Sequence, residues 1–161
     1  MLRGLASCER CVGSPSFSGA WFATGDVATI DADGFVYIVD RVKDLVIRGG
    51  ENISCTEVEQ VVYEALPEVV QELAVFGIPN QRLGEVVGMM VRTKRGQEGK
   101  VTQKDIIAAA AASGKLAKFK LPEHVFFTSD PLPRGATEKI QRREIKKQVI
   151  AMLEKEPKSR L

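Results

Sequence analysis

The sequence predicts an α+β fold in which helices cover a short mixed or antiparallel sheet, with a β-hairpin before it. Strand-like and helix-like patterns after residue 44 follow one another in the order β-α-β-β-α-β-α. The helix-like segments are apolar on one side only, which is typical of helices packed on a sheet. At 161 residues the chain suits one modest domain. We therefore expect a compact unit with its helices on one face of the sheet.

The first predicted element is the hairpin. Two β-prone runs, residues 27–30 and 35–40, flank Asp31-Ala-Asp-Gly34, and the pair Asp33-Gly34 favours the positive φ angles of a tight turn. A further extended run, residues 44–48, ends at Gly49-Gly50.

A helix is predicted directly after this run. Ser54 and Thr56 are candidate N-caps, because Glu57 and Glu59 follow each of them by three residues. Pro67 ends the helix. Its apolar residues recur at helical spacing on one side: Val58, Val61, Val62, Ala65 and Leu66.

Two strands, residues 72–78 and 85–93, are predicted next, separated by the turn-forming residues 79–81 and followed by a charged loop. Thr102 and Asp105 have the spacing of a helix cap, which predicts a helix over 106–112 that Gly114 ends. A short strand over 124–128 and a closing helix over 140–153 complete the domain. The closing helix is expected to turn four residues inward: Ile145, Val149, Met152 and Leu153.

Charge and cysteine content narrow the classes of function. Residues 115–161 carry 12 Lys and Arg against 6 Asp and Glu, so this third of the chain is basic. The basic residues would form either a solvated helix face or a contact for a polyanion such as a nucleotide phosphate. Its aromatic residues do not alternate with the basic ones, which argues against nucleic-acid binding. Three cysteines and one histidine fit neither a disulfide framework nor a metal site, and no apolar run is long enough to span a membrane.

The two ends are expected to differ from the folded part. Residues 1–20 show no periodicity and are expected to form a disordered leader. Residues 154–161 are expected to form a flexible tail. The tail ends in Ser159-Arg160-Leu161, a variant of the Ser-Lys-Leu peroxisomal signal, which predicts binding to the peroxisomal import receptor and a peroxisomal location, with the cytoplasm as the alternative.

Three segments resemble, in order and spacing, the late motifs of the adenylate-forming superfamily of acyl-CoA synthetases. They are Trp21-Phe-Ala-Thr-Gly-Asp26, then Asp40-Arg-Val-Lys-Asp-Leu-Val-Ile-Arg-Gly-Gly-Glu-Asn52 with Glu57-Val-Glu59, then Leu132-Pro-Arg-Gly-Ala-Thr-Glu-Lys-Ile-Gln-Arg-Arg143. The amino-acid sequence of these motifs is most similar to that of fatty-acyl-CoA synthetases. The resemblance implies that residues 43–153 form the small C-terminal lid domain and that 21–42 are a remnant of the large N-terminal domain.

The resemblance also implies a role for each matching residue. Asp26 and Arg41 would bind the nucleotide, since a carboxylate accepts hydrogen bonds from ribose hydroxyls and a guanidinium carries a fixed fork of donors. Lys43 would lie at the hinge between the two catalytic poses. Gly49 and Gly50 would let CoA approach the backbone. Lys139 would be the catalytic residue, stabilising charge on the α-phosphate during adenylation.

The resemblance further implies partners. The substrates would be ATP, CoA and a carboxylate, in a reaction that yields acyl-CoA, AMP and pyrophosphate, with Mg²⁺ held by the large domain. Nothing before Trp21 resembles that domain, so we expect it to act with this chain in cis or in trans. The alternative is a non-catalytic relic or regulatory module, which one departure favours: Glu138 stands where family members usually have glycine. Cys55 stands where proline is common, a change expected to be tolerated.

Overall fold

The computed structural model describes residues 3–5, 17–18, 21–41 and 44–155. The chain divides into two compact units, Met1–Leu45 and Val46–Leu161. None of the helices in the described part of the chain is both long and apolar enough to cross a membrane.

The first unit holds two small antiparallel sheets. β3 (Trp21–Ala23) lies between β1 (Arg3–Leu5) and β2 (Phe17–Ser18). Residues 3–5 and 17–18 thus form strands within the segment expected to be a disordered leader. Strands of two or three residues contain too few positions to show an alternating pattern, which explains why the sequence did not indicate them.

The predicted hairpin is confirmed. β4 (Asp26–Ile30) pairs antiparallel with β5 (Val36–Arg41). The Asp31 carboxylate organises the turn, accepting hydrogen bonds from the backbone N–H of Phe35 at 2.9 Å and from the Tyr37 hydroxyl at 2.9 Å. The bond from Tyr37, with those from the backbone, lowers the pKa of Asp31.

The second unit is built on a five-stranded sheet. Four of its strands follow the order β10 (His124–Thr128), β9 (Gly84–Thr93), β6 (Leu45–Arg48) and β7 (Glu51–Ser54). The fifth strand, β8 (Val70–Asn80), pairs antiparallel with β9. β10 runs parallel to β9. The helices are α1 (Cys55–Ala65), α2 (Gln103–Ala112) and α3 (Arg142–Lys155), and a 3₁₀ turn spans Lys118–Lys120. The α+β fold predicted for this part is confirmed.

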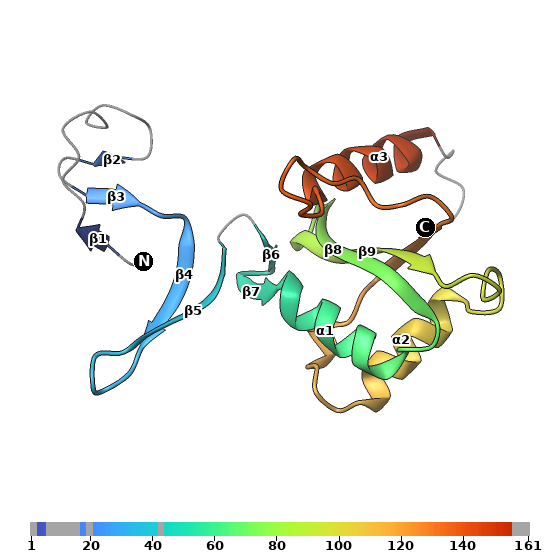
Figure 1. The fold of residues 1–161 in the computed structure, drawn as a ribbon, viewed down its shortest axis with the longest axis horizontal. Coiled ribbons are helices and arrows are strands. Elements are labelled where there is room, and N and C mark those ends of the chain that lie inside the picture. The colour runs from blue at the N-terminus through green and yellow to red at the C-terminus, as the bar shows by residue number, and fades with distance from the viewer. Residues whose placement is uncertain (1–2, 6–16, 19–20, 42–43, 156–161) are drawn as a thin grey trace. The chain divides into compact units, whose positions relative to one another are not determined.

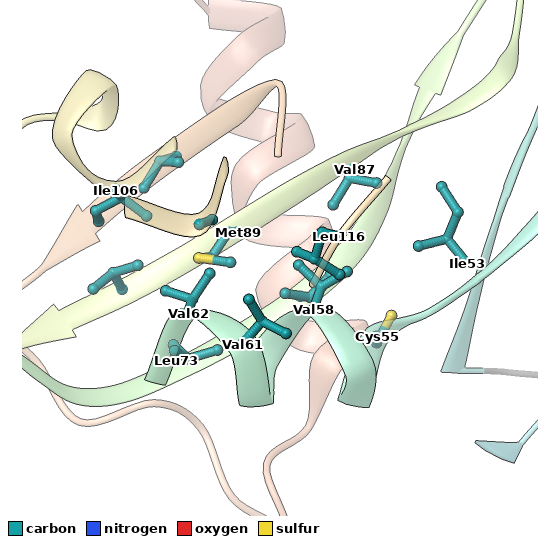
Figure 2. Close-up of a cluster of buried hydrophobic side chains, with 14 of the residues drawn as sticks. Ile53, Cys55, Val58, Val61, Val62, Leu73, Val87, Met89, Ile106 and Leu116 are labelled. Atoms are coloured by element: carbon teal, nitrogen blue, oxygen red, sulfur yellow. The ribbon is translucent and has the colours of Figure 1, made fainter. Parts of the chain in front are cut away.

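The helices cover both faces of the sheet, not one face as expected. α1 and α2 pack on one face and α3 on the other (Figure 1). In β8, Leu73 and Val75 belong to the first cluster, whereas Ala74 and Phe76 belong to the second. The long apolar runs of β8 and β9 therefore supply buried side chains to both faces. Figure 2 shows the first cluster, to which Val58 and Val62 of α1 and Met89 of β9 all belong.

The helix ends follow the sequence signals closely. Ser54 caps α1, its hydroxyl accepting a hydrogen bond from the N–H of Glu57 at 3.2 Å. Thr102 and Asp105 form the predicted capping box of α2. α3 begins at Arg142 instead of residue 140. Met152 was expected to point inward, but it is 54% exposed, whereas Leu153 beside it packs against the second cluster.

Candidate functional site

Lys139 lies in a tightly folded loop between β10 and α3. The N–H of Gly135 donates to the carbonyl of Lys139 at 3.0 Å, and the N–H of Glu138 donates to the carbonyl of Gly135 at 3.0 Å. At the base of the loop, Arg134 and Ile140 form an antiparallel bridge. The Lys139 side chain is exposed, and within the described residues its ammonium forms no ion pair. This loop, residues 134–140, is the Lys139 loop below.

Glu138 has an unusual backbone conformation. Its φ is +59°, and it is the only residue other than glycine with a positive φ in the described part of the chain. A side chain in this left-handed region costs about 1–2 kcal/mol, a cost that glycine does not carry. The departure noted in the sequence therefore falls at a position whose backbone geometry favours glycine. The loop keeps its fold with a strained residue beside its lysine.

An ion-pair network fastens the loop to the sheet. The Arg134 guanidinium donates to the Glu138 carbonyl at 2.7 Å and also bonds the carboxylate of Glu72 on β8. Glu72 further accepts from the N–H of Leu132 at 3.2 Å and from Arg92 of β9 at 3.3 Å. The bond from Arg134, followed by those from Leu132 and Arg92, lowers the pKa of Glu72 despite partial burial. The sequence reasoning missed this network, because it joins residues 62 positions apart.

A second ion pair fastens α3 just beyond the loop. Arg142, the first residue of α3, donates two hydrogen bonds to the Glu59 carboxylate of α1, at 2.8 and 3.1 Å. Glu59 also accepts from the N–H of Val75 in β8 at 2.8 Å. The Lys139 loop is therefore held to the sheet on one side and, through α3, to α1 on the other.

Gly49 and Gly50 form the two-residue turn between β6 and β7. Their φ angles are +58° and +92°, which glycine adopts without strain. The N–H of Gly49 donates to the carbonyl of Leu83 at 2.7 Å. A Cβ at Gly50 would meet no atom within 4 Å, so conformation and not crowding requires glycine there. β7 was not predicted, because residues 51–54 lack an alternating apolar pattern.

The two predicted nucleotide-binding residues are brought together. Asp26 and Arg41 are paired across β4 and β5, and their side chains form an ion pair with 3.2 Å between Arg41 Nε and Asp26 Oδ1. Both belong to the unit Met1–Leu45, whereas Gly49, Gly50 and Lys139 belong to the other unit. The predicted hinge residue, Lys43, lies outside the described residues.

The cysteines and carboxylates of the described residues form no cluster that could hold a metal ion. Cys55 is buried at the start of α1, where it packs in the core. Cys8 and Cys11 lie outside the described residues.

Comparison with known proteins places the chain in a family. Residues 57–139 match the family model of the AMP-binding enzyme C-terminal domain. The chain is 42% identical over 129 residues to the 2-succinylbenzoate–CoA ligase of Geobacillus kaustophilus, an alignment covering 80% of this chain and 25% of that enzyme. It is 36% identical over 140 residues to the long-chain-fatty-acid–CoA ligase FadD13 of Mycobacterium tuberculosis, covering 87% and 26%.

Solved structures of acyl-CoA synthetases also match this chain. ATP-bound MatB of Rhodopseudomonas palustris superimposes with a TM-score of 0.70 at 35% identity, over 85% of this chain and 26% of that one. The chain thus spans about a quarter of the length of the relatives it matches. The match over residues 57–139 includes α1 from Glu57 onward, the whole β8–β9 pair, and Lys139 itself. The chain belongs to the family of AMP-binding enzyme C-terminal domains, the domain it shares with acyl-CoA ligases.

Proposed function

We propose that this chain serves as the catalytic lid of an ATP-dependent acyl-CoA synthetase, which converts a carboxylate, ATP and CoA into acyl-CoA, AMP and pyrophosphate. The observation that supports this most directly is the Lys139 loop: an exposed ammonium, unpaired among the described residues, on a loop fastened to the sheet, inside the segment that matches the family. A large N-terminal adenylation domain supplies the rest of the site, in cis or in trans.

Lys139 is proposed to act in the adenylation half-reaction. The carboxylate oxygen attacks the α-phosphorus of ATP, the bond to the bridging oxygen breaks, and pyrophosphate leaves. Negative charge builds on the phosphoryl oxygens in this step, and an ammonium held close to them in a site shielded from water stabilises that charge. Its long, flexible stem lets the ammonium reach a phosphate beyond the loop surface.

The remaining predicted residues are proposed to bind substrates or to move the lid. Asp26 would accept hydrogen bonds from the ribose hydroxyls, with Arg41 beside it reaching the same nucleotide. Lys43 would serve as the hinge. The open space at Gly50 suits the approach of a CoA arm to the backbone. Mg²⁺, which accompanies ATP, would bind to the large domain.

The acyl group is proposed to be that of a fatty acid, because the Arg-Gly-Gly-Glu-Asn motif is most similar to the corresponding motif of fatty-acyl-CoA synthetases. The relatives include one named for 2-succinylbenzoate and one named for long-chain fatty acids. Because the large domain would supply the rest of the site, both carboxylates should be offered to this chain combined with its own large domain, and not to a mixture with the domain of another ligase. Greater activity with 2-succinylbenzoate than with a long-chain fatty acid would contradict the fatty-acid assignment.

The proposal is tested by complementation. The chain is mixed with the large domain of the M. tuberculosis ligase, truncated before its own lid, and AMP formation from carboxylate, ATP and CoA is measured. We expect the wild type to restore activity and Lys139→Ala to remove most of it. Lys147→Ala is the matched control, because Lys147 is an exposed α3 lysine paired only with a neighbouring carboxylate in the described structure. Equal rescue by Lys139→Ala would refute the catalytic role.

Glu138 favours the second candidate, a non-catalytic module that retains the fold. It combines a strained φ of +59° with a negative charge on the residue that directly precedes Lys139 in the sequence. A module of this kind would bind the large domain without restoring AMP formation. Binding by isothermal calorimetry, together with an inactive mixture, would therefore favour the second candidate over the first.

We also propose a peroxisomal location, through Ser159-Arg160-Leu161, which lies outside the described residues. A fluorescent protein fused before residue 1 should give punctate staining that matches a peroxisomal marker. Deleting residues 159–161 should make the staining diffuse, and adding one glycine after Leu161 should do the same, since the receptor reads a free terminus. Unchanged puncta in both variants would refute this location.

A further inference from the structure

The Glu72 carboxylate is the point at which the Lys139 loop meets the sheet. It is largely shielded, with 16% of its side-chain surface exposed, and it accepts hydrogen bonds from Arg134, Arg92 and the N–H of Leu132. Arg92 is itself held by the carbonyl of Ser129 at 3.2 Å. A carboxylate bound by several donors on a strand of the sheet is a fixed anchor for the loop that binds it.

Arg134 links the Glu72 carboxylate to the peptide bond that precedes Lys139. One guanidinium nitrogen bonds Glu72, and the other donates to the carbonyl of Glu138 at 2.7 Å. The Glu138 carbonyl belongs to the peptide that joins Glu138 to Lys139. A hydrogen bond to this carbonyl fixes the orientation of that peptide plane, and with it the direction in which the Lys139 side chain leaves the backbone.

The backbone around this carbonyl needs such support. Glu138 has a φ of +59°, a conformation that persists only where its surroundings hold it in place. Within the loop, the N–H of Gly135 binds the carbonyl of Lys139 and the N–H of Glu138 binds the carbonyl of Gly135. These bonds close the loop on itself, whereas the Glu72–Arg134 pair is what ties its tip to the sheet.

We propose that Arg134, held by Glu72, is a positioning residue for adenylation that aims Lys139 by bonding the Glu138 carbonyl. This inference rests on the proposed function, because it assigns Arg134 a role that acts through Lys139. It does not require Arg134 to touch any substrate. The guanidinium is suited to the role, since only its planar fork can bond a carboxylate and a carbonyl at the same time with fixed geometry.

The two half-reactions separate positioning from general structural support. In the mixture of this chain with the large domain, adenylation is measured as carboxylate-dependent exchange of pyrophosphate into ATP. Thioesterification is measured from synthetic acyl-AMP and CoA, a step in which the CoA thiol attacks the acyl carbon and AMP leaves, and for which no role of Lys139 is proposed. We expect Arg134→Gln to slow adenylation roughly 10- to 100-fold, the loss typical of a misplaced catalytic group, and to leave thioesterification within about twofold of wild type.

Matched variants sharpen the comparison. Glu72→Gln should also slow adenylation. Arg134→Lys should be as slow as Arg134→Gln, because a single ammonium cannot hold both acceptors in one geometry. Lys146→Gln is the control: it removes a similarly exposed ion pair, to Glu85 at 2.7 Å, without touching the Lys139 loop. It should leave both half-reactions unchanged. Equal losses in both half-reactions for Arg134→Gln would show general structural damage and overturn the proposal.

A double-mutant cycle tests whether Arg134 acts through Lys139. In a Lys139→Ala background, Arg134→Gln should cause no further loss of adenylation, because the group that it positions is gone. An additional loss of tenfold or more would mean that Arg134 meets the substrate directly, and would overturn the positioning role. If Lys139→Ala leaves adenylation intact, the proposed function fails. If Lys139→Ala abolishes adenylation and Arg134→Gln does not slow it, only the present inference fails.

A measurement on the chain alone keeps the inference testable even if the mixture is inactive. Hydrogen exchange of individual amides is followed by NMR on the full chain. Arg134→Gln should speed exchange of the Gly135 and Gln141 amides, which close the loop, by roughly tenfold, while amides of the β8–β9 pair keep their wild-type protection. Unchanged exchange in the loop would show that Arg134 does not hold it, and would overturn the proposal.

Discussion

A glycine at position 138 should stabilise this domain, although the substitution removes a side chain. Glu138 holds a φ of +59°, where a Cβ is placed too close to its own backbone carbonyl. Its side chain is exposed, so no buried contact is lost on removal. The change Glu138→Gly therefore acts on backbone strain alone, apart from the charge.

The magnitude follows from two opposing effects. Relief of the left-handed conformation is worth about 1–2 kcal/mol. The added freedom of glycine in the unfolded chain costs about 0.5–1 kcal/mol. The expected net gain in the free energy of unfolding is therefore about 0.5–1 kcal/mol. For a domain of this size that gain raises the urea midpoint by roughly 0.5 M.

The assay is urea unfolding followed by circular dichroism at 222 nm. All three described helices, α1 to α3, lie in the unit Val46–Leu161, so this signal reports the unit that contains the Lys139 loop. Glu138→Ala is the matched variant, because it removes the charge but keeps the Cβ. It should leave the midpoint near that of wild type, and Glu138→Asn should fall between alanine and glycine, since asparagine tolerates positive φ.

Equal stabilisation by alanine and glycine would refute the reasoning, because it would assign the effect to the carboxylate and not to φ. The same series separates the two effects on catalysis. If the charge weakens adenylation, both variants should raise its rate in the complementation assay. If strain in the loop is the cause, only glycine should do so.

Three further predictions concern the turn, the anchor and a helix cap. Gly50→Ala should destabilise the domain by about 1 kcal/mol, because φ is +92° at a site with free space, and the urea midpoint should fall accordingly. A wild-type midpoint there would refute this reading. Glu72→Gln should cost about 1–2 kcal/mol at pH 7. The folded-state pKa of Glu72 is lowered, so its carboxylate stabilises the fold above its ordinary pKa of 4.5 and loses that effect as the pH falls through the folded value. The difference between Glu72→Gln and wild type should therefore shrink in acid, and a constant difference across pH would argue against it. Thr102→Ala should cost about 1 kcal/mol through loss of the α2 capping box, measured by thermal unfolding, with Thr128→Ala as a control outside any helix cap.

The sequence by itself determined most of the secondary structure. The stripe of Val58 and Val62 and the cap at Ser54 predicted α1, and the pair Thr102 and Asp105 predicted the start of α2. These signals are local, since a cap or a helical stripe is complete within a few residues of sequence. The motif around Lys139 likewise indicated the family before any fold was known.

Only the tertiary structure decided how the layers are arranged and how the loop is held. The apolar runs of β8 and β9 are consistent with burial on one face or on both, and the placement of α3 opposite α1 settles which is present. The pairing of Arg134 with Glu72 joins distant parts of the chain, so no local pattern reveals it. The φ of Glu138 likewise depends on hydrogen bonds that exist only once the loop has closed.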